Sequence, residues 1–175
     1  MLTRRRVVAA AVFWPLAPAA LAETCGAVTA RQTEGPFFKP SSPQRVTLIE
    51  PGSHAPRVAV SGRVLSRDCQ PLKGVLLDFW HADEDGDYDN RGFRYRGHQF
   101  TDADGRWRLE TIVPAVYPGR TRNIHVKVQP AGGRILTTQL YFPNEPQNER
   151  DGLFRRELVM RMSARDEGAF DFVLA

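Results

Sequence analysis

This sequence of 175 residues has few cysteines, few long apolar runs and little excess of charge of either sign. Two cysteines are too few for a disulfide-rich scaffold, and they lack the close Cys-x-x-Cys spacing of a zinc site. No internal repeat or low-complexity tract is present. Hydrophobic residues make up 42% and charged residues 25%, the balance of an ordinary globular chain. This length predicts one domain with a single core.

The charge of the chain depends on its first residues. The formal net charge is +4, but three of the 24 basic residues lie at positions 4–6. From Glu23 onward, 21 basic residues face 20 acidic ones, a net charge of +1. A nearly neutral chain without a basic, aromatic-lined groove motif argues against a nucleic-acid partner.

Residues 1–22 have the pattern of an export signal. Arg4 to Arg6 form a charged start, Val7 to Leu16 an apolar run, and Ala20 to Ala22 a small-x-small cleavage site. The alternative is a membrane span, but the apolar run is shorter than the ~20 residues needed, contains proline, and has no later counterpart. We therefore expect export to the bacterial periplasm or the medium, with no membrane association after the signal is removed.

Thr3 to Val8 also resembles a twin-arginine signal, a route that carries proteins already folded. An exported chain reaches an oxidising compartment, where Cys25 and Cys69 can form one disulfide that ties the mature N-terminus to the first sheet. Two unpaired thiols are the alternative.

The mature chain divides into an irregular arm, residues 23–57, and an all-β domain, residues 58–175. The arm is rich in Pro, Gly, Thr and Ser. After it, short segments with period-two alternation and intervening turns predict a β-sandwich. The expected strands are Val58–Val64, Val75–Trp80, Trp107–Thr111, Ile124–Val128, Arg134–Phe142 and Ala169–Leu174, and the one candidate helix is Leu153–Met162.

Polar and aromatic residues cluster where the predicted strands end, in Trp80–Tyr88, Tyr117–His125 and Thr137–Phe142. Period-two alternation puts Asn123 and His125 on one face of their strand. By themselves these residues also fit a structural role, with Tyr88 as an exposed loop aromatic, Tyr117 packing a corner and His125 a hydrogen-bonded sheet histidine. His54 is expected to be exposed. The acidic run at 83–89 lacks the twelfth-position Glu of a calcium loop.

The order of these motifs resembles the intradiol ring-cleavage dioxygenases, specifically their short exported single-domain relatives. The resemblance covers Thr33 to Phe142. It rests on several ordered matches, namely T-E-G-P-F-F from residue 33, W-H-A-x-x-x-G-x-Y from 80, T-D-x-x-G from 101, T-I-x-P-x-x-Y-P-G-R from 111, I-H-x-K-V from 124 and T-T-Q-L-Y-F from 137.

The resemblance implies a β-sandwich that holds a non-haem ferric ion with two tyrosinates and two histidines. The tyrosines fall on Tyr88 and Tyr117, and the His-x-His pair falls on Asn123 and His125. Anionic oxygen donors suit a hard, highly charged ion. Asn123 departs from the pattern, because a neutral amide oxygen is a weaker donor than imidazole. It can ligate weakly, water can take its place, or the iron site can be lost. His98 is a further candidate as a surrogate ligand.

The resemblance also implies catalytic roles. Arg120 matches an arginine that stabilises negative charge on the substrate, Gln139 a polar residue of the active-site wall, and Tyr117 a phenolate that the substrate displaces and that then acts as a base. The implied reaction cleaves a catecholic diol with dioxygen to a muconate-type diacid. His81 is treated as structural or as a neighbour of the ligands. The alternative function is a non-catalytic binding or structural module that has lost the iron site.

Overall fold

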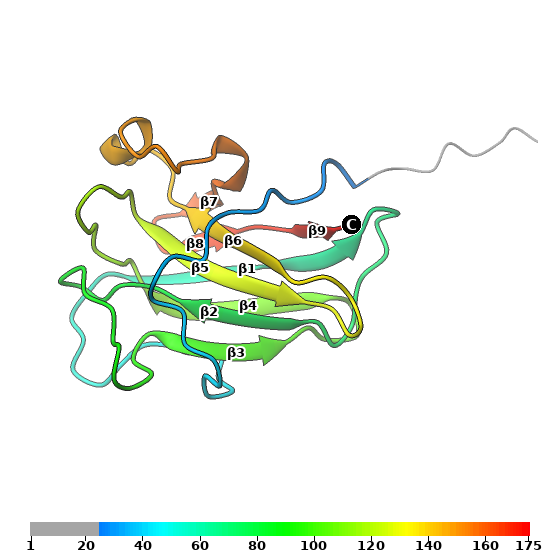
Figure 1. Cartoon of the computed structure of the whole chain (residues 1–175), viewed down its shortest axis with the longest axis horizontal. Helices are drawn as coiled ribbons and strands as arrows, with labels where there is room; N and C mark the ends of the chain where they lie inside the picture. Colours follow the sequence, from blue (N-terminus) through cyan, green and yellow to red (C-terminus); the bar gives the residue numbers. More distant parts are fainter. Residues whose placement is uncertain (1–24) are drawn as a thin grey trace, which may run out of the picture.

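The computed structural model describes residues 25–175. The predicted export signal, residues 1–22, lies outside them. The described chain is almost entirely β-structure (Figure 1). Its elements are the strands β1 (Arg57–Ser66), β2 (Leu76–Trp80), β3 (Arg96–Phe100), β4 (Arg106–Ile112), β5 (Asn123–Gln129), β6 (Leu136–Tyr141), β7 (Arg161–Ala164), β8 (Glu167–Ala169) and β9 (Phe172–Leu174), with the 3-10 turns η1 (Pro146–Glu149) and η2 (Arg156–Leu158).

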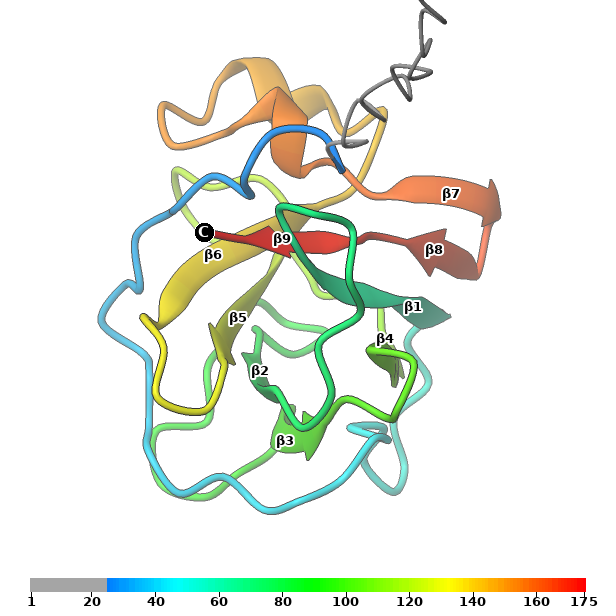
Figure 2. The same cartoon turned by 90° about the vertical axis from the view of Figure 1, so that its right-hand side faces the viewer.

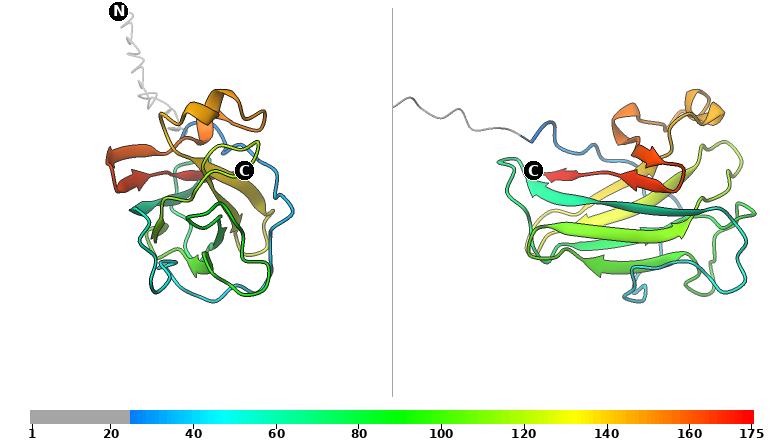
Figure 3. Two further views of the ribbon diagram at one scale, coloured as in Figure 1. Left: turned by 90° about the vertical axis from the view of Figure 1, so that its left-hand side faces the viewer. Right: turned by 180° about the vertical axis from the view of Figure 1, so that it is seen from behind.

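The strands form two sheets that face each other, which confirms the predicted β-sandwich (Figures 1 and 2). One sheet has the order β3-β2-β5-β6 and is antiparallel throughout. The other has the order β4-β1-β8-β7, with β9 pairing farther along β1 (Figure 3). Strands β8 and β9 run parallel to β1, so the C-terminal segment completes the second sheet.

Alternating apolar residues explain where the core lies. Val58 and Val60 of β1 point inward from one sheet, and Ile124 and Val126 of β5 point inward from the other. All four are buried at 2% exposure or less. The intervening residues of β5, Asn123 and His125 among them, therefore face the opposite side of their sheet.

The N-terminal arm covers that opposite face. Gln32 donates its backbone N–H to Thr137 of the edge strand β6, and Arg45 donates to His98 of the other edge strand, β3, each at 2.9 Å. Because the two attachment points lie at opposite edges, residues 33–44 must cross the outer face of the four-stranded sheet (Figures 1 and 2). The arm also satisfies edge groups that would otherwise be free to pair with another chain.

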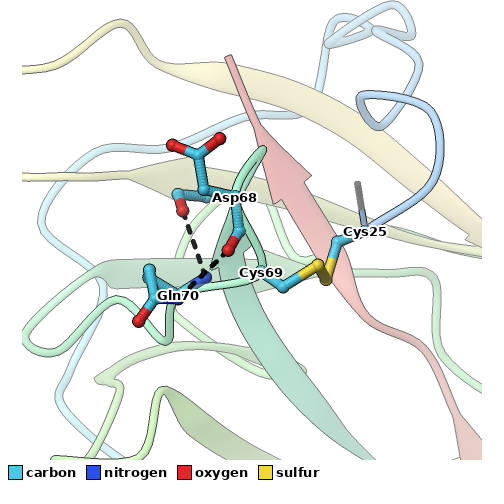
Figure 4. The surroundings of a disulfide bond; sticks show 5 residues. Cys25, Asp68, Cys69 and Gln70 are labelled. Carbon is cyan, nitrogen blue, oxygen red and sulfur yellow. Dashed lines mark hydrogen bonds between the residues drawn. A yellow bond between two sulfur atoms is a disulfide. The ribbon is translucent and has the colours of Figure 1, made fainter. Parts of the chain in front are cut away.

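The arm begins at a disulfide. Cys25 is joined to Cys69, with the Cα atoms 4.9 Å apart (Figure 4). Cys69 lies in the turn that follows β1, where the side chain of Gln70 donates to the Asp68 carbonyl. The bridge therefore fixes the start of the arm beside the first strand of the domain.

Several sequence expectations differ from the structure. The predicted helix over Leu153–Met162 is wrong: the chain there makes only the short turn η2 and then enters β7. The backbone N–H of Met160 donates to the Tyr141 carbonyl at 2.9 Å, so pairing with the edge of β6 replaces helical bonding. Strands β3 and β7 were not predicted, and the predicted strand Ala169–Leu174 is interrupted at residues 170–171, between β8 and β9. Across the described residues, no helix is long and apolar enough to cross a membrane.

Candidate metal centre and active site

The site begins as a row of side chains across the outer face of the four-stranded sheet. His125 of β5 lies opposite Trp80 of β2 on one side and Gln139 of β6 on the other. The rings of His125 and Trp80 are stacked, with centroids 4.9 Å apart. Each of these three side chains is at most 1% exposed. The sheet register alone therefore places an imidazole and an amide side by side beneath the arm.

Tyr88 reaches this row from the loop that follows β2. The carboxylate of Asp83 accepts the backbone N–H groups of Asp85 and Asp87, at 3.0 and 2.9 Å, which makes the turn compact. Tyr88 then stacks on Phe37 of the arm, with ring centroids 4.3 Å apart. The acidic residue that leads this loop is thus occupied by the backbone rather than presented to a ligand.

Tyr117 completes an aromatic cluster around His125. The ring centroids of Tyr88 and Tyr117 are 5.6 Å apart, and those of Tyr88 and His125 are 6.1 Å apart. Tyr88 is buried, whereas Tyr117 is partly exposed at the rim. The structure thus brings together the two phenols and the imidazole that the sequence singled out.

Four polar atoms at this place are buried without a hydrogen-bond partner in residues 25–175. Trp80 Nε1 is a donor that cannot bind a cation, whereas the Tyr88 hydroxyl, His125 Nδ1 and Asn123 Oδ1 can. Unpaired buried polar atoms are uncommon and destabilising, and one explanation for a cluster of them is an ion. The last three are two hard oxygen donors and an imidazole nitrogen, a set that suits ferric iron. The donors therefore fit the metal that the resemblance implies.

Burial controls the protonation of these groups. It lowers the pKa of His125 to about 3, with Arg120 adding a smaller effect of the same sign, so the ring is neutral at pH 7 and retains a lone pair for a metal. Burial raises the pKa of Tyr88 well above its ordinary value, and the nearby Tyr117 phenol adds to the shift. Ionisation of Tyr88 near neutral pH thus needs a cation beside it.

The described residues contain no group of three or more His, Cys, Asp and Glu side chains that could hold a metal ion. Any metal centre here must depend on tyrosine oxygen. Such a site differs in kind from the common carboxylate and histidine clusters.

Arg120 links the rim of the site to its wall. Its guanidinium donates to the Tyr117 hydroxyl at 3.0 Å, to Gln139 Oε1 at 2.6 Å, and to Asp151 Oδ2 at 2.9 Å. Gln139 in turn donates to the Thr33 carbonyl of the arm at 2.8 Å. These three hydrogen bonds fix the orientation of the guanidinium and hold its positive charge beside the Tyr117 oxygen.

Asp151 is the residue that sequence reasoning missed. Its side chain is 1% exposed and accepts hydrogen bonds from Arg120, from the Thr121 backbone N–H and from the Leu153 backbone N–H, each at 2.9 Å. It lies in the loop after η1, about thirty positions from Arg120 and Thr121, and no local sequence pattern indicates these two contacts. Its carboxylate both offsets and orients the Arg120 charge.

The other histidines do not join the cluster. Both ring nitrogens of His81 are engaged, by the Ala82 carbonyl at 2.7 Å and by the Thr111 hydroxyl at 2.6 Å. His98 lies on β3 opposite Asp78, and its Nδ1 lies 2.7 Å from the Ser42 carbonyl. His54 is exposed. The structure therefore gives His98 a place under the arm instead of the surrogate-ligand position considered for it.

A cavity of about 460 Å³ opens beside Tyr117 and Arg120. Its other lining residues are Val116, the Pro118–Gly119 turn, and Gln147, Arg150 and Asp151 of the loop around η1. The volume is within the range of sites that hold small organic ligands. A molecule in this cavity would meet the exposed edge of Tyr117 and the Arg120 cation first.

Comparison with known proteins gives a consistent picture. The sequence profile of a family described as "Dioxygenase" matches residues 33–175. The protocatechuate 3,4-dioxygenase beta chain of Burkholderia cepacia is 32% identical over 150 residues, which cover 67% of this chain and 64% of that protein. A chlorocatechol 1,2-dioxygenase of Pseudomonas sp. (strain P51) is 30% identical over 135 residues, which cover 62% of this chain and 53% of that protein. The chain thus spans between about half and two thirds of the length of these two curated relatives.

Solved structures extend the similarity to three dimensions. The dioxygenase domain of a dioxygenase and carbohydrate-binding protein fusion from Streptomyces sp. SirexAA-E is 56% identical with a TM-score of 0.81, and the match covers 85% of this chain and 98% of that one. The 3-chlorocatechol 1,2-dioxygenase of Rhodococcus opacus 1CP is 28% identical with a TM-score of 0.76, covering 83% and 71%.

Proposed function

The chain belongs to the intradiol ring-cleavage dioxygenase family, and on that premise we propose that it is an exported, Fe(III)-dependent enzyme that cleaves a catecholic diol with dioxygen. The observation that carries the proposal is the cluster of unpaired buried donors, Tyr88, His125 and Asn123, next to Tyr117. Tyr88, Tyr117 and His125 would hold the iron. When bound, the metal supplies the Lewis acidity and the redox chemistry that allow a diol to react with dioxygen.

The protein contributes proton transfer and charge stabilisation. Tyr117, which the iron would hold as a phenolate, is partly exposed at the mouth of the cavity, where its oxygen can accept a proton from a diol hydroxyl. Arg120 donates to that same oxygen, so its charge lies where negative charge develops on the substrate. Trp80 and Phe37 supply apolar surface around the donors, which excludes water and strengthens these interactions.

The overall reaction adds both atoms of dioxygen to the diol. The bond between the two hydroxylated carbons breaks, and the product is a muconate-type diacid. No further reductant is needed, because the ring itself supplies the electrons. The substrates are thus a small aromatic diol and dioxygen.

The proposal is tested by measuring oxygen uptake and diacid formation from catechol by the iron-loaded protein. Tyr117→Phe and His125→Ala should each abolish turnover. Tyr95→Phe is the matched control, because Tyr95 is also a buried tyrosine but bonds to Glu84. Unchanged turnover in the Tyr117 or His125 variants would refute their assigned roles. Iron-free, inactive wild-type protein would favour the binding-module alternative.

Export is part of the proposal and is supported by the Cys25–Cys69 disulfide, since such bonds persist in oxidising compartments. Fractionation of cells that produce the full chain, compared with a variant in which Arg4 and Arg5 are replaced by Lys, tests it. Retention of the variant in the cytoplasm is the expected result. Equal export of both forms would contradict the twin-arginine route.

A further inference from the structure

Asn123 stands where the family pattern has a histidine, and its side chain is oriented in one particular way. We propose that the Asn123 amide oxygen is itself a protein donor to the iron, so that the metal is held by two phenol oxygens, one imidazole and one neutral amide oxygen. This inference rests on the proposed function, because it concerns the same metal centre.

The hydrogen bonds of Asn123 fix which end of its amide faces the site. Asn123 Nδ2 donates to the Thr121 carbonyl at 2.8 Å. A carbonyl oxygen can only accept, so the amide nitrogen must face it and Oδ1 must point away. Oδ1 is buried, in a side chain only 3% exposed, and has no hydrogen-bond partner among the described residues. The free end of this amide is therefore a hard oxygen donor.

The position of Asn123 puts it on the same face of β5 as His125, at the end of the sheet where the Tyr88 and Tyr117 loops start or finish. Asn123 and His125 lie two residues apart on the same face of β5. Strand β2 ends at Trp80, opposite His125, so Asn123 has no β2 neighbour and lies beyond the end of that strand. The loop that carries Tyr88 begins at this end of β2, and the loop that carries Tyr117 leads directly into Asn123.

Asn148 shows what a structural asparagine looks like in the same neighbourhood. Its Oδ1 accepts from the Thr121 hydroxyl at 2.7 Å, and its Nδ2 donates to the Phe142 carbonyl at 3.0 Å. Both ends of that amide are paired. Only one end of the Asn123 amide is paired, although Asn123 is the more buried of the two. A purely structural role leaves its oxygen unexplained, whereas a bound cation satisfies it.

The donor type predicts an order of iron affinities. A neutral amide oxygen is a weaker donor than imidazole or carboxylate, so Asn123→His and Asn123→Asp should bind ferric iron more tightly than the wild type. Asn123→Leu keeps a similar volume but removes the donor, and should weaken binding by roughly 10-fold or more, since losing a residue that merely supports a ligand already costs about that much. The tyrosinate-to-iron absorption band should move to longer wavelength in Asn123→Leu, because loss of a donor makes the metal more electron-poor.

The experiment uses the full mature protein, stripped of metal and titrated with ferric citrate against a competing chelator, with absorption and melting temperature recorded for each sample. Asn148→Leu is the matched control and should leave affinity and band position unchanged. Melting of the metal-free variants checks folding, and iron should raise the melting temperature of the wild type more than that of Asn123→Leu.

The outcomes separate this inference from the proposed function. If Asn123→Leu binds iron like the wild type with the same band, the amide is not a ligand. If the wild type binds no iron but Asn123→His does, the inference is wrong while the remaining ligands are correctly assigned. If no variant binds iron, the proposed function fails with it.

Discussion

The carboxylate of Asp151 should be the most costly single group to neutralise in this domain. It accepts three hydrogen bonds and is almost fully buried beside Arg120, whose side chain is only 10% exposed. Asp151→Asn keeps the shape but replaces one oxygen by an amide nitrogen, which must face an N–H group. One charge-assisted bond, worth about 1.5–3 kcal/mol, is lost, and a buried donor is left unpaired at about 1–3 kcal/mol. The buried Arg120 charge also loses its counter-ion.

We therefore expect Asp151→Asn to lower the free energy of unfolding by about 3 kcal/mol or more, which is a large part of the stability of a typical domain. Urea unfolding at pH 7, followed by tryptophan fluorescence, measures the change. The metal-free protein is used, so that loss of iron does not contribute.

The matched control is Asp104→Asn. Asp104 also pairs with an arginine, Arg106, at 2.6 Å, but both side chains are more than half exposed. An exposed pair contributes about 1 kcal/mol at most. If the two substitutions destabilise the protein equally and weakly, burial of the Asp151–Arg120 pair is not what stabilises this region, and the assigned role of Asp151 is refuted.

Three further predictions concern His81, Tyr88 and Gly62. Burial lowers the pKa of His81 from 6.5 to about 4, so the unfolded chain binds more protons between these values and stability falls as the pH drops through that window. Between pH 7 and pH 5, His81 should lower the free energy of unfolding by about 2 kcal/mol. Urea unfolding of His81→Gln should show a pH dependence that is smaller by this amount. An equal pH dependence in the variant and the wild type would contradict the assignment. Tyr88→Phe removes a buried hydroxyl that has no hydrogen-bond partner among the described residues, so the free energy of unfolding of the metal-free protein should change by less than about 1 kcal/mol. The visible absorption of the iron-loaded variant should be weaker than that of the wild type. A large loss of stability in the metal-free variant would mean that the hydroxyl makes a hydrogen bond in the folded protein. A side chain at Gly62 would place its Cβ 1.8 Å from the carbonyl oxygen of Phe170, which lies between β8 and β9. Gly62→Ala should therefore lower the free energy of unfolding by about 3 kcal/mol, measured by thermal or urea unfolding. A neutral effect would mean that β1 and the segment at Phe170 separate easily.

The sequence predicts the sandwich wherever one face of a strand is apolar. Val58 to Val64 and Ile124 to Val128 alternate clearly, and both lie in observed strands. Strand β3 escapes this reasoning because its sequence, Arg-Gly-His-Gln-Phe, has no apolar alternation. Its Gly97 faces Leu48 of the arm, and a Cβ there would lie 2.7 Å from a Leu48 methyl group. Burial at that position is supplied by a residue about fifty positions earlier, which no local pattern can reveal.

The candidate site, like the fold, was predictable only in part. The resemblance identified Tyr88, Tyr117, Arg120, Asn123, His125 and Gln139 as candidates. The structure places five of them next to one another and Asn123 two residues from His125 on the same strand. The resemblance could not identify the bond between Arg120 and Asp151 or the stacking of Phe37 on Tyr88, because each contact joins segments far apart in the chain. The orientation of the Asn123 amide also depends on the observed Thr121 contact, which residue identity alone does not specify.

The measurement that tests the central claim most directly is the visible absorption spectrum of the mature protein, with iron quantified in the same sample after aerobic, iron-replete production. The account predicts close to one iron per chain and a broad tyrosinate-to-iron charge-transfer band that is weakened in Tyr88→Phe. Colourless protein that neither contains iron nor binds added ferric ion would contradict it, because the buried donors at Tyr88, Asn123 and His125 would then have to be unpaired for another reason.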